Sequence, residues 1–396
     1  MDRRNFIRSA IGGTAGIVSS GKIYGASLVQ KPAGKEIICR TLGKTGIRVP
    51  VVSMGVMNAD NPNLVKAALD AGIVHLDTAN KYQRGRNEEM IGEVIKDRSR
   101  DSFVIATKVS GGSVDKETGV YTDEDAPAEF LKDLDVSLDR LGLKYVDILY
   151  LHGVKSRTGA LHEPLMEALL KAKKTGKTRF IGLSTHSHEP EVIRAAVESR
   201  IYDVVLTAYN FKQDHHAEVG RAITEAGKAG LGIVAMKTIP GGGFLDREKQ
   251  KPLDPRAALK WVLSNEQVHT TIPGFTTFDQ LQADVEVMYD LRINKTEQTE
   301  LEEAMSFQGF YCQGCEACLP QCPNGMPVPD LMRAWMYAYG YRNRLEAYDL
   351  VQELHIPAGG CDTCQDCRVV CRKAFDIKDK INNIIRLRDI PREFVA

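Results

Sequence analysis

The sequence predicts an α/β fold: a TIM (β/α)8 barrel followed by a small helical C-terminal domain. The chain has 396 residues, which is longer than one typical domain. Between residues 37 and 295, short β-branched runs alternate with longer amphipathic stretches of helical period. Eight of the nine cysteines lie between Cys312 and Cys371, so a different kind of unit follows the alternating part.

Composition excludes two classes of protein. Lys plus Arg equals Asp plus Glu at 52 each, so the chain carries no formal net charge. Without a basic excess to neutralise phosphates, we expect no nucleic-acid partner. No apolar run reaches the roughly 20 residues that a membrane-spanning helix needs, so no membrane span is predicted.

The first 30 residues are predicted to be a targeting segment rather than part of a folded domain. Arg3 and Arg4 precede Phe6, and an uncharged stretch of small and apolar residues runs from Ser9 to Gly21. This pattern resembles a twin-arginine export signal, and a basic N-terminal helix is the alternative. We expect a periplasmic protein, or a cytoplasmic one if the signal is not used.

Eight strands are expected in the alternating region, each followed by a helical or turn segment. They are Val51–Val56, Ile73–Thr78, Phe103–Lys108, Val146–His152, Arg179–Ser184, Val204–Tyr209, Gly232–Lys237 and Thr270–Pro273. Helices are expected at Asp125–Leu141 and Glu163–Lys174, and Asp254 before Pro255 is typical of a helix start. A doubly wound sheet is the alternative, but eight units favour a closed barrel.

Polar residues gather where the predicted strands end, which is where barrel enzymes place their chemistry. His75-Leu76-Asp77-Thr78 is followed by Tyr82, and the next strand ends in Ala106-Thr107-Lys108 and the one after it in Tyr150-Leu151-His152. These segments resemble the aldo/keto reductase family, and the resemblance covers residues 37–295.

The resemblance implies a role for each of four residues in reducing a carbonyl group. Tyr82 would donate the proton, Lys108 would lower the tyrosine pKa, Asp77 would hold Lys108, and His152 would orient the carbonyl oxygen. Taken singly, each could be a structural residue. Together, in order on successive strand ends, they indicate catalysis.

No Gly-x-Gly-x-x-Gly element follows a strand, so a Rossmann domain is not predicted. The resemblance implies a nicotinamide dinucleotide across the barrel. Its contacts would be Ser184, Thr185, Tyr209, Met236, Lys237, Gly241, Gly242 and Gly274. Three positions depart from the family pattern, namely Thr185, Leu206 and Met236. No Lys or Arg lies between Gly274 and Val287 to hold a 2′-phosphate, so NAD(H) is as well supported as NADP(H).

The C-terminal cysteines form two runs with the spacing of bacterial ferredoxins. The first is Cys312, Cys315, Cys318 and Cys322, and the second is Cys361, Cys364, Cys367 and Cys371. This spacing predicts two [4Fe–4S] clusters, the fourth cysteine of each run binding the other cluster. Zinc competes, but it favours paired CxxC units. We therefore expect a ferredoxin-like domain over residues 300–396, in which helices within Asp330–Leu354 cover the clusters and pack on the barrel.

The sequence thus predicts an oxidoreductase that transfers hydride between a nicotinamide cofactor and a small carbonyl or alcohol substrate. A hydride carries two electrons and each cluster passes one, so the clusters would serve a redox partner protein. The alternative is an electron-transfer or scaffold protein with a non-catalytic barrel, in which the clusters are functional or structural.

Overall fold

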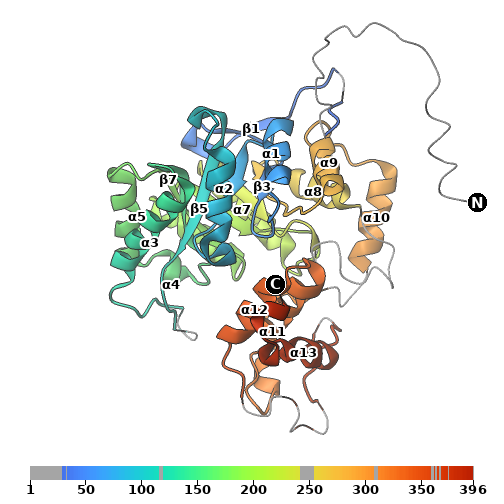
Figure 1. Cartoon of the computed structure of the whole chain (residues 1–396). Helices are drawn as coiled ribbons and strands as arrows, with labels where there is room; N and C mark the ends of the chain where they lie inside the picture. The colour runs from blue at the N-terminus through green and yellow to red at the C-terminus, as the bar shows by residue number, and fades with distance from the viewer. Residues whose placement is uncertain are drawn as a thin grey trace, which may run out of the picture.

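A computed structural model describes most of the chain (Figure 1). The described residues are 29–32, 34–115, 119–240, 254–306, 311–357, 361, 364, 367–372 and 374–395. Nearly all of the predicted signal segment, and both Gly241 and Gly242, lie outside them. Within these ranges, no helix combines the length and the apolar character needed to span a membrane.

In the described part of the chain, eight parallel strands form one ring. In sheet order they are β10 (Thr270–Thr271), β9 (Gly232–Met236), β8 (Val204–Ala208), β7 (Thr178–Thr185), β6 (Val146–His152), β5 (Val104–Ser110), β4 (His75–Asp77) and β3 (Met54–Gly55). The first and last strands meet where the Ser53 N–H donates to the Thr271 carbonyl at 2.8 Å and the Thr271 N–H donates to the Val51 carbonyl at 3.0 Å. The predicted TIM-type barrel is confirmed, with every strand at its expected place.

Helices surround the ring and bury their apolar faces against it. They are α1 (Pro62–Ala71), α2 (Arg86–Ile95), α3 (Ala126–Leu141), α4 (Arg157–Ala160), α5 (Glu163–Lys174), α6 (Glu189–Ser199), α7 (His216–Lys228), α8 (Pro255–Leu263) and α9 (Phe278–Val287), with short 3-10 turns η2 (Tyr82–Gly85) and η3 (Arg100–Ser102). The Asp254 carboxylate accepts the Arg256 N–H at 2.9 Å with Pro255 in the first turn, so the expected N-cap is present.

A hairpin that the sequence did not reveal closes the N-terminal end of the barrel. It consists of β1 (Cys39–Thr41), the turn η1 (Gly43–Thr45) and β2 (Arg48–Pro50). Its apolar side chains, such as Leu42 and Val49, are fully buried among those that fill the barrel interior. Gly43 has a φ of 52°, and a side chain there would meet the Gly232 nitrogen at 2.4 Å. The hairpin therefore requires glycine at this position.

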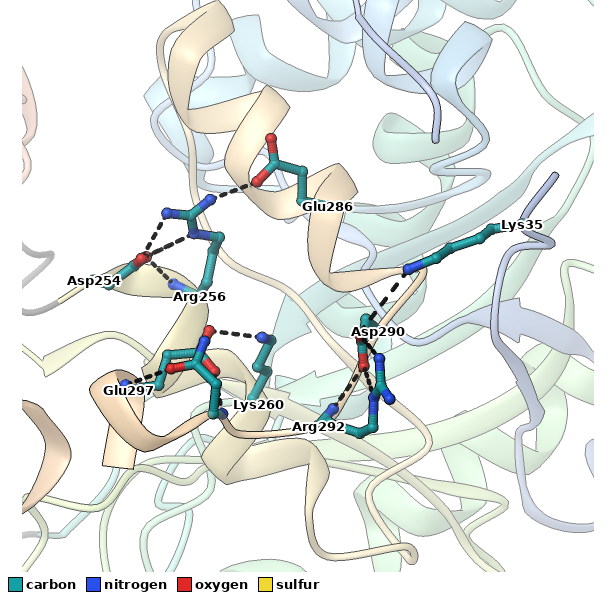
Figure 2. A network of polar contacts seen from close by, with 9 residues as sticks. Lys35, Asp254, Arg256, Lys260, Glu286, Asp290, Arg292 and Glu297 are labelled. Carbon is teal, nitrogen blue, oxygen red and sulfur yellow. Dashed lines mark hydrogen bonds and ion pairs between the residues drawn. The ribbon is translucent and has the colours of Figure 1, made fainter. Parts of the chain in front are cut away.

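Ion pairs join the last barrel helices to each other and to α10 (Lys295–Ser306), as Figure 2 shows. Arg256 bonds Glu286 of α9 at 2.5 Å, and Lys260 of α8 bonds Glu297 of α10 at 2.6 Å. Because the second pair is nearly buried, α10 is held firmly against α8. The expected domain boundary at residue 300 thus falls inside a helix that packs on the barrel.

The N-terminal boundary differs in a similar way. Val29 is buried in the barrel core, and Gln30 exchanges two hydrogen bonds with Gln282 of α9, at 2.8 and 3.2 Å. Val29 and Gln30 therefore belong to the folded barrel, although the sequence assigned them to the export segment.

The remaining residues, 311–395, form a separate lobe that we call the cysteine module (Figure 1). Its elements are η5 (Leu319–Gln321), α11 (Val328–Trp335), a π-helical turn η6 (Met336–Gly340), α12 (Arg344–Glu353), α13 (Lys378–Ile384), η7 (Ile385–Asp389) and η8 (Arg392–Phe394). Leu331, Met332, Val351 and Ile381 belong to its small apolar core, and several cysteines pack at the edge of that core.

Candidate active site and cysteine centre

The ends of β4 and β5 bring three of the predicted catalytic residues together. Asp77 lies opposite Ala106, so Lys108, two residues further on the same face, reaches back over the end of β4. The Lys108 ammonium donates to the Asp77 carboxylate, to the Thr78 carbonyl at 2.6 Å and to the Tyr82 hydroxyl at 3.4 Å. The Lys108 and Asp77 side chains are 1% and 2% exposed, so this ion pair is shielded from water.

Burial governs the protonation of this group. It raises the pKa of Tyr82 above its ordinary value; the Lys108 charge lowers that pKa, and the Asp77 charge raises it again. The lowering by Lys108 is thus present as predicted, but moving the phenol out of water outweighs it, so the net shift of the Tyr82 pKa is upward. Burial lowers the pKa of Lys108, but the Asp77 charge outweighs this and the net shift is upward. At neutral pH the tyrosine is protonated and the lysine charged, as a proton donor and its supporting cation must be.

Unusual backbone geometry fixes Tyr82. Gln83, Arg84 and Gly85 follow it with φ angles of 51°, 57° and 92°, all in the left-handed region. The Gln83 side chain donates to the Met57 carbonyl at 3.0 Å, which ties this turn to the loop after β3. Left-handed non-glycine residues are costly and cluster at functional sites, so the strain indicates that the position of Tyr82 matters.

His152 ends β6 beside the tyrosine. The two rings lie 5.9 Å apart between centroids and nearly perpendicular, at 81°. Burial, with the charges of Lys108 and Lys81, lowers the pKa of His152 to about 3. The imidazole is therefore neutral at physiological pH, and its N–H can donate to a carbonyl oxygen without introducing a second positive charge.

Ser184 and Thr185, at the end of β7, are two of the predicted cofactor contacts. The Ser184 hydroxyl accepts the Gly153 N–H at 2.9 Å and keeps its own proton for another acceptor. The Thr185 hydroxyl donates to the Ser187 carbonyl at 2.9 Å. Ser184 can thus still donate to a carboxamide, whereas the Thr185 proton is already used.

Met236 and Lys237 lie at the end of β9, and Gly274 follows β10. Lys237 has a left-handed φ of 53°, and its carbonyl accepts the Asn210 side-chain N–H at 2.9 Å. Its ammonium donates to no group in the described part of the chain. Burial, and next the Arg333 charge, lower the pKa of Lys237 to about 8. A desolvated ammonium beside a second cation favours an anionic ligand such as a pyrophosphate.

Tyr209 is not part of this set. Its ring packs 5.0 Å from Trp261 in the layer between strands and helices, and a side chain at Gly220 would meet its hydroxyl at 2.9 Å. The prediction that Tyr209 contacts the cofactor is therefore corrected: the residue directly after β8 points outward. Gly241 and Gly242 lie outside the described residues and stay a prediction.

Sequence reasoning assigned no role to Arg140, which supports the site from α3. Its guanidinium donates to the Asn80 carbonyl at 2.9 Å and to the Glu88 carboxylate at 3.2 Å, and Glu88 also accepts the Thr107 hydroxyl at 2.6 Å. This network fixes the segment leading to Tyr82 and the strand that carries Lys108. The local sequence around Arg140 gives no signal for this contact, because Glu88 lies 52 residues away along the chain.

The cysteine module brings the two runs together crosswise. Burial raises the pKa of Cys318 to about 11, and the neighbouring thiolates of Cys312, Cys315 and Cys371 add to this. Cys371, the fourth member of the second run, therefore lies within electrostatic range of Cys312 and Cys318 of the first run. Thiolates so close together repel one another unless a cationic group lies between them, so this donor set fits an iron–sulfur cluster.

Hydrogen bonds between the runs fix this crossing. The Val370 N–H donates to the Gln321 side chain at 2.8 Å, and that side chain donates back to the Val370 carbonyl at 3.3 Å. On the other side, the Asn324 amide donates to the Cys364 sulfur at 3.2 Å. Across the described residues, no three His, Cys, Asp or Glu side chains are arranged to hold a single metal ion.

The barrel and its buried lysine–tyrosine set define an oxidoreductase of the aldo/keto reductase class. The model of the aldo/keto reductase family matches residues 54–257, more than half of the chain, so the chain belongs to that family. The model of a 4Fe-4S dicluster domain matches residues 311–377, the part that carries both cysteine runs.

Individual relatives agree with this assignment. L-glyceraldehyde 3-phosphate reductase from Escherichia coli is 26% identical over 67% of this chain and 91% of its own length. L-galactose dehydrogenase from Arabidopsis thaliana is 26% identical over 68% of this chain and 93% of its own length. A solved aldo-keto reductase from Bacillus halodurans, 24% identical, aligns with a TM-score of 0.54 over 68% of this chain and 96% of its own. That last likeness bears on the fold alone.

Proposed function

We propose that the protein interconverts a small carbonyl compound and its alcohol with NAD(H) or NADP(H) at the C-terminal end of the barrel. The observation that carries the proposal is the buried Lys108 ammonium, held by Asp77 and bonded to the Tyr82 hydroxyl at 3.4 Å. The His152 ring lies beside Tyr82, and both residues are only partly buried.

The chain's own residues would handle the proton and the developing charge. A bound dihydronicotinamide supplies the hydride to the carbonyl carbon. Tyr82 donates its phenolic proton to the carbonyl oxygen as negative charge develops there, and Lys108 stabilises the phenolate that remains. His152, neutral at physiological pH, donates its N–H to the same oxygen and orients it. In the reverse direction the Tyr82 phenolate takes the proton from the alcohol.

Ser184 and Lys237 are the described residues best suited to hold the dinucleotide, through its carboxamide and its pyrophosphate. Specificity for a 2′-phosphate has little support, because no Lys or Arg lies between Gly274 and Val287, the segment that leads into and forms α9. Its N-terminal N–H groups are also engaged: the Thr277 hydroxyl and the Gln280 side chain form a capping box there. We therefore expect NADH to serve at least as well as NADPH.

The cysteine module would hold two [4Fe–4S] clusters. Cys312, Cys315, Cys318 and Cys371 would ligate one, and Cys361, Cys364, Cys367 and Cys322 the other. Such clusters take up and release single electrons, which suits exchange with a redox partner protein. Export in the folded state by the twin-arginine route would let the clusters be assembled before the protein reaches the periplasm.

The direct test is reduction of simple aldehydes by the anaerobically purified full chain, followed by the loss of reduced nicotinamide absorbance. Tyr82→Phe is expected to lower kcat by about 10²–10⁴-fold, which is the usual contribution of a general acid to the rate. Tyr289→Phe removes a phenol from the helical shell and is the matched control. Equal rates in both variants, or no reduction of any aldehyde by the unmodified chain, would overturn the proposal.

A further inference from the structure

The cysteine module docks on the end of the barrel that carries the catalytic set. The Asn343 amide donates to the Asn58 side chain, in the loop after β3, at 2.9 Å. Arg84, two residues after Tyr82, bonds Asp349 at 2.6 Å. The contacts thus come from loops that follow the strands, not from the hairpin end of the barrel.

Helix α12 makes both contacts with one face. Asn343 is its N-cap, and Asp349 lies six residues further along. Glu346 stands midway, and residues three apart in a helix project from the same side. Because its neighbours on either side are bonded to loops flanking Tyr82, Glu346 faces the same part of the barrel.

The electrostatics agree with this placement. The Glu346 charge raises the pKa of Tyr82 and of Tyr337, so the carboxylate lies within electrostatic range of the catalytic phenol. Burial, and then the charges of Asp349 and Glu353, raise the pKa of Glu346 to about 7, while Arg84 opposes this. The Glu346 carboxylate accepts no hydrogen bond within the described part of the chain. A half-buried carboxylate without a protein partner leaves its acceptor sites to water or to a ligand that supplies donors.

The same end of the barrel also carries positively charged side chains. Lys108 and Lys81 lower the pKa of His152, and Lys237 and Arg333 lower that of His186. A cationic substrate would meet these groups, and an anionic one would meet Glu346. An uncharged compound with several hydroxyl groups can donate to the carboxylate and accept from the cations at once.

We propose that Glu346 is a substrate-binding residue that accepts hydrogen bonds from the hydroxyl groups of an uncharged polyhydroxylated carbonyl compound or alcohol. The cysteine module then forms part of the substrate site and sets its specificity. This rests on the proposed function for the chemistry that follows binding, but the binding itself can be measured without turnover.

The experiment is a ligand-observed NMR titration of the anaerobic full chain with erythritol and, separately, with 1-butanol. Both probes have four carbons, and only erythritol carries a hydroxyl on each. We expect erythritol to bind more tightly than 1-butanol. Measured above the Glu346 pKa of about 7, where the carboxylate is ionised, Glu346→Gln should weaken erythritol binding about tenfold or more, the range for a hydrogen bond to a charged group, and leave 1-butanol binding unchanged.

Glu353→Gln is the matched control, because it removes the same charge from an exposed position near the end of α12. It should change erythritol binding less than twofold. If Glu346→Gln misfolds, Glu346→Asp is the second variant. It keeps the negative charge but moves the carboxylate away by one methylene group, so it should weaken the binding of erythritol and not that of 1-butanol. No erythritol binding by the unmodified chain, or equal binding by Glu346→Gln, would overturn the proposal.

Aldehyde reduction in the same preparations separates this inference from the proposed function. If the unmodified chain reduces aldehydes but erythritol binds equally well to the Glu346→Gln variant, this inference alone is contradicted. Erythritol binding that depends on Glu346, in a chain that reduces no aldehyde, would contradict the oxidoreductase proposal alone.

Discussion

The barrel site and the cysteine module contrast in how their reactive groups are held. Lys108 and Asp77 are almost completely buried and are placed by neighbouring strands whose register fixes them to one another. The cysteines lie on turns at the edge of a small core, most of them partly exposed. The barrel thus builds its chemistry from contacts within the protein. In the module, the final positions of the thiolates are set only when they bind their metal group.

The largest effect should follow from breaking the buried ion pair. Lys108→Met leaves the Asp77 carboxylate unpaired, and one of its oxygens already has no described partner. We expect a loss of about 3–5 kcal/mol in the free energy of unfolding, measured in urea, together with loss of aldehyde reduction. Lys108→Met combined with Asp77→Leu should recover stability but not activity.

Lys173→Met is the control for this pair, since Lys173 binds Asp203 in a half-exposed ion pair. It should cost less than about 1 kcal/mol. A similar loss of unfolding free energy in Lys108→Met and Lys173→Met would contradict the claim that burial makes the Lys108–Asp77 pair the more important of the two for stability.

The next largest effect should fall on the module alone. Cys371→Ser removes a thiolate that lies within electrostatic range of Cys312 and Cys318, and should reduce bound iron from about eight to about four atoms per chain. The module's unfolding transition should shift while that of the barrel stays. Cys39→Ser, in the barrel hairpin, should leave the iron content unchanged. Retention of all iron in Cys371→Ser would refute the crosswise ligand set.

Acid should destabilise the barrel through a buried histidine. Burial lowers the pKa of His75 to about 4, so between pH 6.5 and 4 the unfolded chain binds a proton that the folded chain does not. The free energy of unfolding should therefore fall as the pH drops through this window, by about 3 kcal/mol in full. His75→Asn should flatten that slope in urea titrations, whereas His355→Gln, at an exposed position of the module, should not. An unchanged slope in His75→Asn would contradict this.

The smallest effect concerns the contact between the two regions. Arg84 is 55% exposed and Asp349 12% exposed, so the arginine side of their ion pair is open to water. A double-mutant cycle of Arg84→Ala and Asp349→Ala should give a coupling of about 0.2–1 kcal/mol in the stability of the full chain. A coupling above that range would mean that the module and the barrel fold as one unit.

Sequence reasoning succeeded where the signal is local. Strand periodicity placed the eight barrel strands, and the residues at their ends identified Asp77, Lys108 and His152. Cysteine spacing identified the module. Sequence reasoning failed where the structure of a segment depends on its contacts with distant segments. The hairpin at the N-terminal end of the barrel has strands of only three residues, too short for a clear alternation.

Orientation and solvation were also beyond the sequence. Tyr209 follows β8 as expected, but Trp261 from a helix some fifty residues later decides where its ring packs. The Tyr82 pKa depends on how much water the surrounding loops exclude, which no motif records. The placement of Glu346 near Tyr82 follows only from the docking of α12 on two barrel loops.

The most direct test of the account is a single turnover with NADH deuterated at the transferable position of C4, an aldehyde and the anaerobic full chain. We predict that the deuterium appears on the carbinol carbon of the product alcohol, and that Tyr82→Phe suppresses its appearance. Oxidation of NADH with bleaching of the iron–sulfur absorbance and no deuterium in the alcohol would contradict hydride transfer in the barrel.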